Sequence, residues 1–147
     1  MQKKIEKLSG HYIICGIDGV GKHILDELIS TKREGLMIDI NPEKLEKAVK
    51  LYDDIAHLEG DATDENVLRE AAIERAAGLF VATGDDNVNL VILLTARQIV
   101  KNVRIVCCIH NNKNIEKARN AGADSVVSPT FIGGLRMASE MVRPTVV

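Results

Sequence analysis

Six short apolar runs alternate with stretches of helical periodicity, and this alternation limits the possible folds more than any other feature of the chain. Consecutive apolar residues within the runs are typical of strands that are buried on both faces of a parallel sheet. The order predicts an α/β fold: a single doubly wound parallel sheet, Rossmann-like, with strand order 3-2-1-4-5-6. We assign this domain to residues 11–147 and a linker to residues 1–10. The runs lie at residues 11–15, 35–40, 54–59, 78–83, 103–109 and 124–128.

The stretches between the runs carry helix signals. Residues 20–29 place Val20, Ile24, Leu25 and Leu28 on one face of a 3.6-residue period. Further along the chain, three segments have start signals or apolar content typical of helices. These are Asn41 before Pro42, Asp64 before an apolar face, and the apolar residues 88–100.

Composition excludes several functional classes. The net charge is −2, the pI is near 6.1 and aromatic residues are 3% of the chain, so no basic surface or stacking platform for nucleic acid is expected. Cys15, Cys107 and Cys108 are an odd number in apolar runs, which indicates buried, reduced thiols. No apolar run approaches the roughly 20 residues of a membrane span, and no signal peptide is evident. We therefore expect a cytoplasmic protein.

The segment IICGIDGVGKHI nearly matches a dinucleotide-binding fingerprint. Gly16, Asp18 and Gly21 occupy the slots of Gly-x-Gly-x-x-Gly between the first strand and the first helix. We expect Gly16 to make the tight turn and Gly21 to let the helix approach the sheet closely. Asp18 puts a negative charge where a pyrophosphate is expected. We predict that it turns to solvent in a left-handed conformation, that Gly19 permits the close approach of phosphate, and that Lys22 offsets the charge. The alternative is that these glycines only make a strand-to-helix turn.

Asp39 ends the second strand about 20 residues after the glycines, where an acidic side chain accepts a hydrogen bond from a ribose 2′-hydroxyl. It would also repel a 2′-phosphate, which favours NAD or an adenosine nucleotide over NADP. A carboxylate at this position is equally compatible with a cap that binds no ligand.

Five motifs follow one another along the chain. They are IICGIDGVGKHI, MIDINPEKLE, a central segment running from HLEGDATDENVL through AIERA to TGDDNVNL, ARNAGADSVVSP and GGLRMASEMVRPTVV. In the order of these motifs, the chain resembles the N-terminal lobe of a regulator-of-potassium-conductance (RCK) domain of the TrkA-N type. The resemblance covers about residues 10–147 and is strongest to the RCK domains that are attached to potassium channels. Asp18 departs from the family pattern, which commonly has glycine there.

The resemblance implies a nucleotide site that binds NAD or else ADP, ATP or AMP. Asp86 and Asn89 are equally well explained as the polar first turn of a helix. Some family members hold calcium near the residue that matches Asp61, but Asp85 and Asp86 alone supply few oxygens here, so we expect no metal. The implied contacts are Gly16, Ile17, Asp18, Gly19, Val20, Gly21, Asp39, Ile40, Asn41, Asp61, Ala62, Thr83, Gly84, Asp86 and Asn89.

The resemblance also implies a function. We expect a cytoplasmic regulatory domain, with no catalytic residues, that senses a ligand and gates a membrane-embedded potassium channel or transporter pore. No histidine, serine or cysteine stands in an arrangement typical of catalysis. The alternatives are a separately encoded subunit that docks on a transporter, and a small NAD(H)-dependent oxidoreductase.

The last helical segment carries many apolar residues, among them Phe131, Leu135, Met137 and Met141. This is more than one sheet face is expected to cover, so we predict a homodimer through this helix, or a higher ring of such pairs. The alternative is that the helix closes the core of its own sheet.

Overall fold

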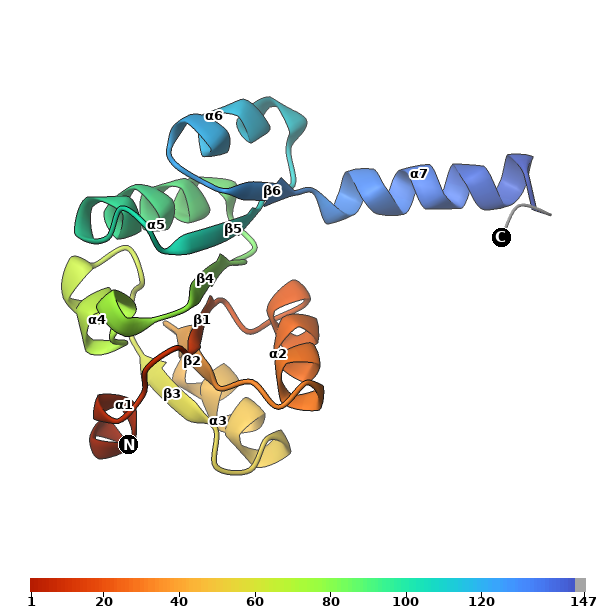
Figure 1. The fold of residues 1–147 in the computed structure, drawn as a ribbon. Coiled ribbons are helices and arrows are strands. Elements are labelled where there is room, and N and C mark those ends of the chain that lie inside the picture. Colours follow the sequence, from red (N-terminus) through yellow and green to blue (C-terminus); the bar gives the residue numbers. More distant parts are fainter. Residues whose placement is uncertain (145–147) are drawn as a thin grey trace.

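Six parallel strands form one sheet in the order β3-β2-β1-β4-β5-β6. The computed structural model describes residues 1–144. The single α/β domain and the predicted strand order are confirmed (Figure 1). The strands are β1 (Tyr12–Cys15), β2 (Gly35–Asp39), β3 (Ala56–Glu59), β4 (Gly78–Val81), β5 (Arg104–Cys108) and β6 (Ser125–Val127).

Helices connect the strands and lie on both sides of the sheet, as Figure 1 shows. No helix among residues 1–144 is long and apolar enough to cross a bilayer. The α-helices are α1 (Gln2–Glu6), α2 (Val20–Ser30), α3 (Pro42–Leu51), α4 (Glu65–Glu70), α5 (Asp86–Ile99), α6 (Ile115–Asn120) and α7 (Pro129–Val142), and two short 3₁₀ turns are η1 (Ile73–Arg75) and η2 (Asn112–Asn114).

Side-chain caps set the beginnings of three helices. Asn41 accepts hydrogen bonds from the amides of Glu43 and Lys44 at the start of α3, and Asp64 accepts one from the amide of Asn66 at the start of α4. Both predicted caps are confirmed. Helix α5 is capped by Asp85, one residue before the predicted polar turn begins at Asp86.

The alternation of side chains along each strand divides the core into two parts. Ile13, Cys15 and their neighbours face α1, α4, α5 and α6, while Ile14 and Met37 face α2 and α3. The larger part contains fully buried residues from the four central strands, β2, β1, β4 and β5, among them Leu36, Leu79 and Ile105. The runs are therefore apolar on consecutive positions because both faces of the sheet are covered.

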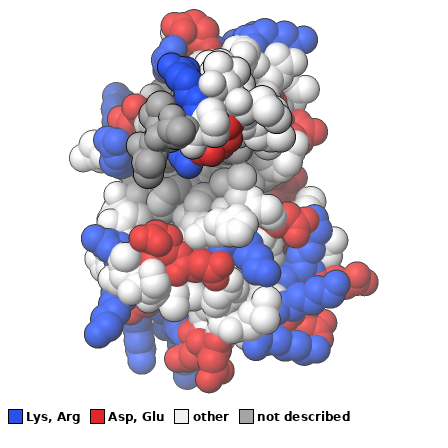
Figure 2. All heavy atoms as spheres, turned by 90° about the vertical axis from the view of Figure 1, so that its right-hand side faces the viewer, with Lys and Arg blue, Asp and Glu red and all other residues white. Residues whose placement is uncertain are grey.

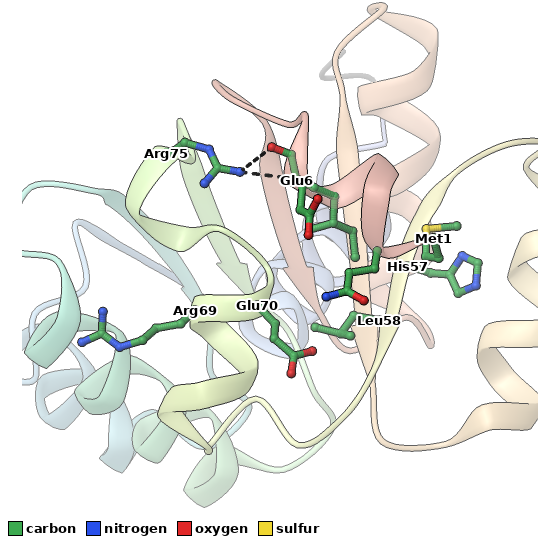
Figure 3. A pocket seen from close by; sticks show the side chains of 9 residues that line it. Met1, Glu6, His57, Leu58, Arg69, Glu70 and Arg75 are labelled. Carbon is green, nitrogen blue, oxygen red and sulfur yellow. Dashed lines mark hydrogen bonds between the residues drawn. The ribbon is translucent and has the colours of Figure 1, made fainter.

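Residues 1–10 pack against the domain. Ile5 and Leu8 belong to the larger core, and the guanidinium of Arg75 donates a hydrogen bond to the carbonyl of Leu8 (2.9 Å). It donates another to the carbonyl of Glu6 (3.1 Å), as Figure 3 shows. Gly10 adds a backbone bond to the carbonyl of Arg75 (2.7 Å). The depression between α1 and the end of α4 holds about 410 Å³ and is lined by charged and apolar side chains together. The N-terminal segment is thus fastened to the loop before β4.

Helix α7 projects away from the sheet (Figure 1). None of its residues is buried, and Leu135, Met137 and Met141 are 58%, 76% and 83% exposed. Figure 2, seen from the side toward which α7 points, shows uncharged residues across the middle of this face and charged residues mainly above and below. The alternative that α7 closes its own sheet is therefore wrong.

Three thiols and one imidazole are buried in the core. Cys15, Cys107 and Cys108 are buried free thiols, as expected, and burial raises the pKa of Cys15 and Cys107 to about 12. His11 is fully buried with its Nε2 2.9 Å from the carbonyl of Ala71. Burial lowers the pKa of His11, so this ring is neutral in the folded protein at pH 7.

Candidate functional site

A pocket of about 530 Å³ opens at the carboxyl ends of β1, β2, β3 and β4. The strand order reverses between β1 and β4, and ligands of open α/β sheets bind at this switch point. The pocket is lined by Cys15, Gly16, Asp18, Ile38, Asp39, Ile40, Lys44, Gly60, Asp61, Ala62, Thr63, Ala82, Thr83, Gly84, Asp85, Val88 and Ile92.

Two glycines shape the loop between β1 and α2. Gly16 has φ +92°, and a Cβ there would lie 2.7 Å from the carbonyl oxygen of Ala82. A Cβ on Gly21 would lie 1.8 Å from the carbonyl oxygen of Gly16, because α2 starts directly against the loop. The tight turn predicted for Gly16 and the close packing predicted for Gly21 are both present. The backbone therefore approaches the pocket with no side chain between, which is the cradle that a phosphate requires.

Helix α2 starts without a side-chain cap, unlike α3, α4 and α5. Its N-cap is Gly19, with φ +52°, and no side chain accepts from its first-turn amides. Amides of this kind at a helix N-terminus are suited to a phosphate. The loop is therefore compatible with a nucleotide, apart from the charge of Asp18.

Asp18 differs from prediction in two respects. Asp18 does not adopt the predicted left-handed conformation; the residues of this loop with positive φ are Gly16 (+92°) and Gly19 (+52°, with ψ −110°). Its carboxylate is turned outward, with 70% of the side chain exposed, but its partner is Lys44 of α3 at 2.5 Å rather than the predicted Lys22. The correction has a physical reason: Lys22 lies on the exposed side of α2, whereas the first turn of α3 presents Lys44 across the pocket.

Asp39 is held by the backbone around it. One carboxylate oxygen accepts from the amide of Asn41 (2.9 Å) and the other from the amide of Ile17 in the glycine loop (3.2 Å). A carboxylate has about four acceptor positions, so both oxygens retain one for a ribose hydroxyl. Asp39 thus fixes the loop and faces the pocket at the same time.

The opposite wall is formed by the turn after β3. The Thr63 hydroxyl (2.6 Å) and amide (2.9 Å) donate to Asp61, and these bonds hold the pKa of that carboxyl below its ordinary value. Ala62 is buried beside it. This wall presents a small apolar surface next to a fixed carboxylate.

Asn89 positions the third wall, after β4. Its side chain is fully buried, accepts from the amide of Thr83 (3.1 Å) and donates to the carbonyls of Thr83 (3.1 Å) and Cys108 (2.9 Å). It thus ties the pocket lip to the end of β5 from behind.

Asp86 also points away from the pocket. Its carboxylate accepts from the amides of His110 (2.8 Å) and Asn111 (2.9 Å) and from the Asn114 side chain (3.0 Å). Asp86 therefore links the start of α5 to the loop after β5.

The predicted contacts fall into two groups. Those that line the pocket are Gly16, Asp18, Asp39, Ile40, Asp61, Ala62, Thr83 and Gly84. Those that shape its walls without lining it are Ile17, Gly19, Val20, Gly21, Asn41, Asp86 and Asn89.

Lys44 lines the pocket but is absent from the predicted contacts. Its position one turn into the helix after Asp39 was a usable signal, because a first turn beside a strand end faces the pocket. The charged side chains of the lining are four carboxylates, from Asp18, Asp39, Asp61 and Asp85, and the Lys44 ammonium. Within residues 1–144, no three acidic, histidine or cysteine side chains are grouped so as to hold a metal ion.

Comparison with known proteins places this geometry in a family. The TrkA-N domain matches residues 12–129. The chain is 40% identical over 145 residues to "Probable potassium channel protein 2" of Methanocaldococcus jannaschii, covering 98% of the chain and 42% of that protein. It is 34% identical to "Potassium channel protein 1" of the same organism, over 100% of the chain and 44% of that protein. The chain thus spans less than half the length of these relatives.

A solved structure of a ligand complex has the same fold. The crystal structure of GsuK bound to ADP superposes with a TM-score of 0.77 at 27% identity, over 94% of this chain and 35% of that one.

Proposed function

The chain belongs to the TrkA-N domain family, and from this premise we propose that it is a regulatory domain that binds NAD(H) or another adenosine nucleotide and gates a potassium channel or transporter. The observation that carries the proposal is the pocket at the switch point of the sheet, where the bare backbone at Gly16 lies beside the carboxylate of Asp39. The domain acts by binding and not by catalysis, at the cytosolic face of the membrane.

In this proposal, each part of an adenosine nucleotide is assigned to one part of the pocket. The phosphates lie at the uncapped start of α2, the ribose hydroxyls are accepted by Asp39, and the adenine packs between Ile40 and Ala62. Ile40 supports this placement because it is 68% exposed at the rim, where an apolar side chain gains from a covering base. The ADP named in the GsuK structure supports the ligand class.

The pore partner is proposed from the relatives, which are described as potassium channel proteins. A ligand gates such a partner only by binding one conformation of the domain better than another. Residues 1–10 are the proposed route to the pore. Arg75 holds the carbonyls of this segment and precedes β4, whose far end forms the pocket lip at Thr83.

We further propose that α7 mediates a homodimer, from which a larger ring can be built. The face carries Phe131, Ile132, Leu135 and Met141, all more than half exposed. Val127, just before α7, is a further exposed apolar residue at the end of β6. An apolar surface of this extent is typical of a protein interface.

Calorimetric titration with NAD⁺, NADH, ADP and AMP tests nucleotide binding. Asp39→Ala is expected to weaken all four, because each has the ribose that Asp39 accepts. Asp53→Ala is the control, since this exposed aspartate lies outside the pocket. If neither the wild type nor Asp18→Gly binds any of them at millimolar concentration, the proposed nucleotide function is wrong.

Sedimentation tests the dimer. We expect the wild type to associate at tens of micromolar and Leu135→Glu or Met141→Glu to remain monomeric. Leu51→Glu is the matched control, because Leu51 is a comparably exposed leucine (66%) on α3, away from α7. A wild type that is monomeric at these concentrations and unchanged by the α7 substitutions would exclude this interface.

A further inference from the structure

We propose that Lys44 determines which adenosine nucleotides the pocket accepts, and that Asp18 weakens phosphate binding mainly by holding the Lys44 ammonium. This inference deepens the proposed function and rests on it. It identifies a specificity residue and assigns Asp18 a different action from simple repulsion of the ligand.

The first observation is the charge of the lining. Four carboxylates face the pocket with one ammonium, so the lining carries an excess of negative charge where the glycine loop offers a place for phosphate. Among the described residues that line the pocket, Lys44 is therefore the one positive side chain that can offset a pyrophosphate. The pocket then discriminates between ligands by the number of negative charges that they carry.

The second observation is the position of the pair. Asp18 and Lys44 line both the nucleotide pocket and a neighbouring depression of about 310 Å³ between α2 and α3. The ion pair is thus the boundary between the two. Lys22 and Lys47 lie on the far side of this boundary and do not line the nucleotide pocket.

The third observation is the set of groups acting on the ammonium. The hydrogen bond and charge of Asp18, and more weakly the charge of Asp39, raise the pKa of Lys44. Lys44 and Asp39, whose carboxylate would accept the ribose, both line the nucleotide pocket. Both members of the pair are well exposed, at 44% and 70% of their side chains, so the pair is weak enough for a ligand phosphate to replace Asp18.

Two actions of Asp18 can be separated by a double-mutant cycle. If Asp18 acts by holding Lys44, Asp18→Asn improves ADP binding only while Lys44 is present. If Asp18 repels the phosphate directly, Asp18→Asn improves ADP binding equally with or without Lys44. The side-chain volume is nearly unchanged in Asp18→Asn, so the loop conformation is preserved.

The experiment measures the dissociation constants of ADP and NAD⁺ by calorimetry for the wild type, Asp18→Asn, Lys44→Met and the double variant. We expect Lys44→Met to weaken ADP about tenfold and NAD⁺ less, because NAD⁺ carries fewer negative charges. We expect Asp18→Asn to tighten ADP about fivefold in the wild-type background and less than about twofold in the Lys44→Met background.

Lys22→Met and Lys47→Met are the controls, since each removes one positive charge nearby without touching the pocket lining. Thermal unfolding without ligand shows that the variants are folded. An equal gain from Asp18→Asn in both backgrounds, or a loss in Lys22→Met as large as in Lys44→Met, overturns this inference and leaves the proposed function standing. Absence of binding by all four proteins at millimolar ligand overturns both.

Discussion

Helices α5 and α7 are each 14 residues long and apolar, and each follows a strand of the same sheet, yet only α5 is built into the core. Helix α5 buries Asn89, Ile92, Leu93 and Ala96, whereas α7 buries no residue. The two helices therefore have different partners. Helix α5 packs on its own sheet and holds the pocket lip, while α7 presents its apolar face outward for a second chain in our proposal.

The helix starts differ in the same sense. Asp85 caps α5 by accepting from the amides of Asn87 (2.8 Å) and Val88 (3.1 Å). Ser128 stands at the same position of α7 but forms no capping bond, and its buried hydroxyl has no hydrogen-bond partner within residues 1–144. Helix α5 is thus fixed at both its face and its end, and α7 depends on its surroundings for more of its stability.

The largest expected difference comes from matched leucines. Leu93→Ala should lower the free energy of unfolding by about 3 kcal/mol, because Leu93 is fully buried and its loss leaves a cavity. Leu135→Ala should change it by less than about 0.5 kcal/mol, because this side chain is exposed in the single chain. Urea unfolding at low micromolar protein measures both. Equal losses would contradict the distinction between the two helices.

Asn89 provides a second test within α5. Asn89→Ala should cost about 2 kcal/mol, because the amide of Thr83 and the carbonyl of Cys108 lose their buried partner. The same substitution should weaken nucleotide binding, since the lip at Thr83 is no longer held. Gln98→Ala, at an exposed position of the same helix, is the control. Unchanged stability in Asn89→Ala would show that these bonds are replaced by water.

Substitution of the two N-cap residues compares the helix starts directly. Asp85→Ala should lower the free energy of unfolding by about 1 kcal/mol, since two first-turn amides lose their acceptor. Ser128→Ala should change it by less than about 0.5 kcal/mol, because the hydroxyl it removes has no partner in the structure. Thermal unfolding distinguishes the two, and a larger loss from Ser128→Ala would reverse the comparison.

The smallest expected effect is a pH dependence of the free energy of unfolding that comes from Asp86, in the first turn of α5. Helix α7 has no equivalent, since its first turn contains no acidic residue. Partial burial alone would raise the pKa of Asp86, but hydrogen bonds from the His110 amide, the Asn114 side chain and the Asn111 amide outweigh it, so the pKa is lowered. The ionised form therefore stabilises the fold above the unfolded pKa of about 3.9, and this contribution is lost as the pH falls through the lower folded value.

Unfolding measured between pH 6 and pH 3 tests this prediction. The wild type should lose stability more steeply than Asp86→Asn below about pH 4, because only the wild type must protonate this carboxylate. Parallel curves for the two proteins would remove Asp86 as the origin of the dependence.

Residue patterns along the chain predict the order of strands and helices, the caps at Asn41 and Asp64, and the roles of Gly16 and Gly21 in the loop. These features are local: each follows from residues a few positions apart, or from apolar periodicity that only a sheet covered on both faces satisfies. The position of Asp39 at a strand end could be predicted for the same reason.

Which polar groups contact one another depends on how distant segments of the chain pack together. The partner of Asp18 is Lys44 rather than Lys22 because the first turn of α3 lies across from the glycine loop. The number of residues between Asp18 and Lys44 does not predict this contact. Asp86 turns away from the pocket because its donors, the amides of His110 and Asn111, lie in the loop after β5. Asn89 joins Thr83 of the pocket lip to Cys108 at the end of β5, 19 positions later in the chain. Helices α5 and α7 are a further example. Their sequences both predict apolar helices, and packing in three dimensions shows that α5 covers its own sheet whereas α7 does not.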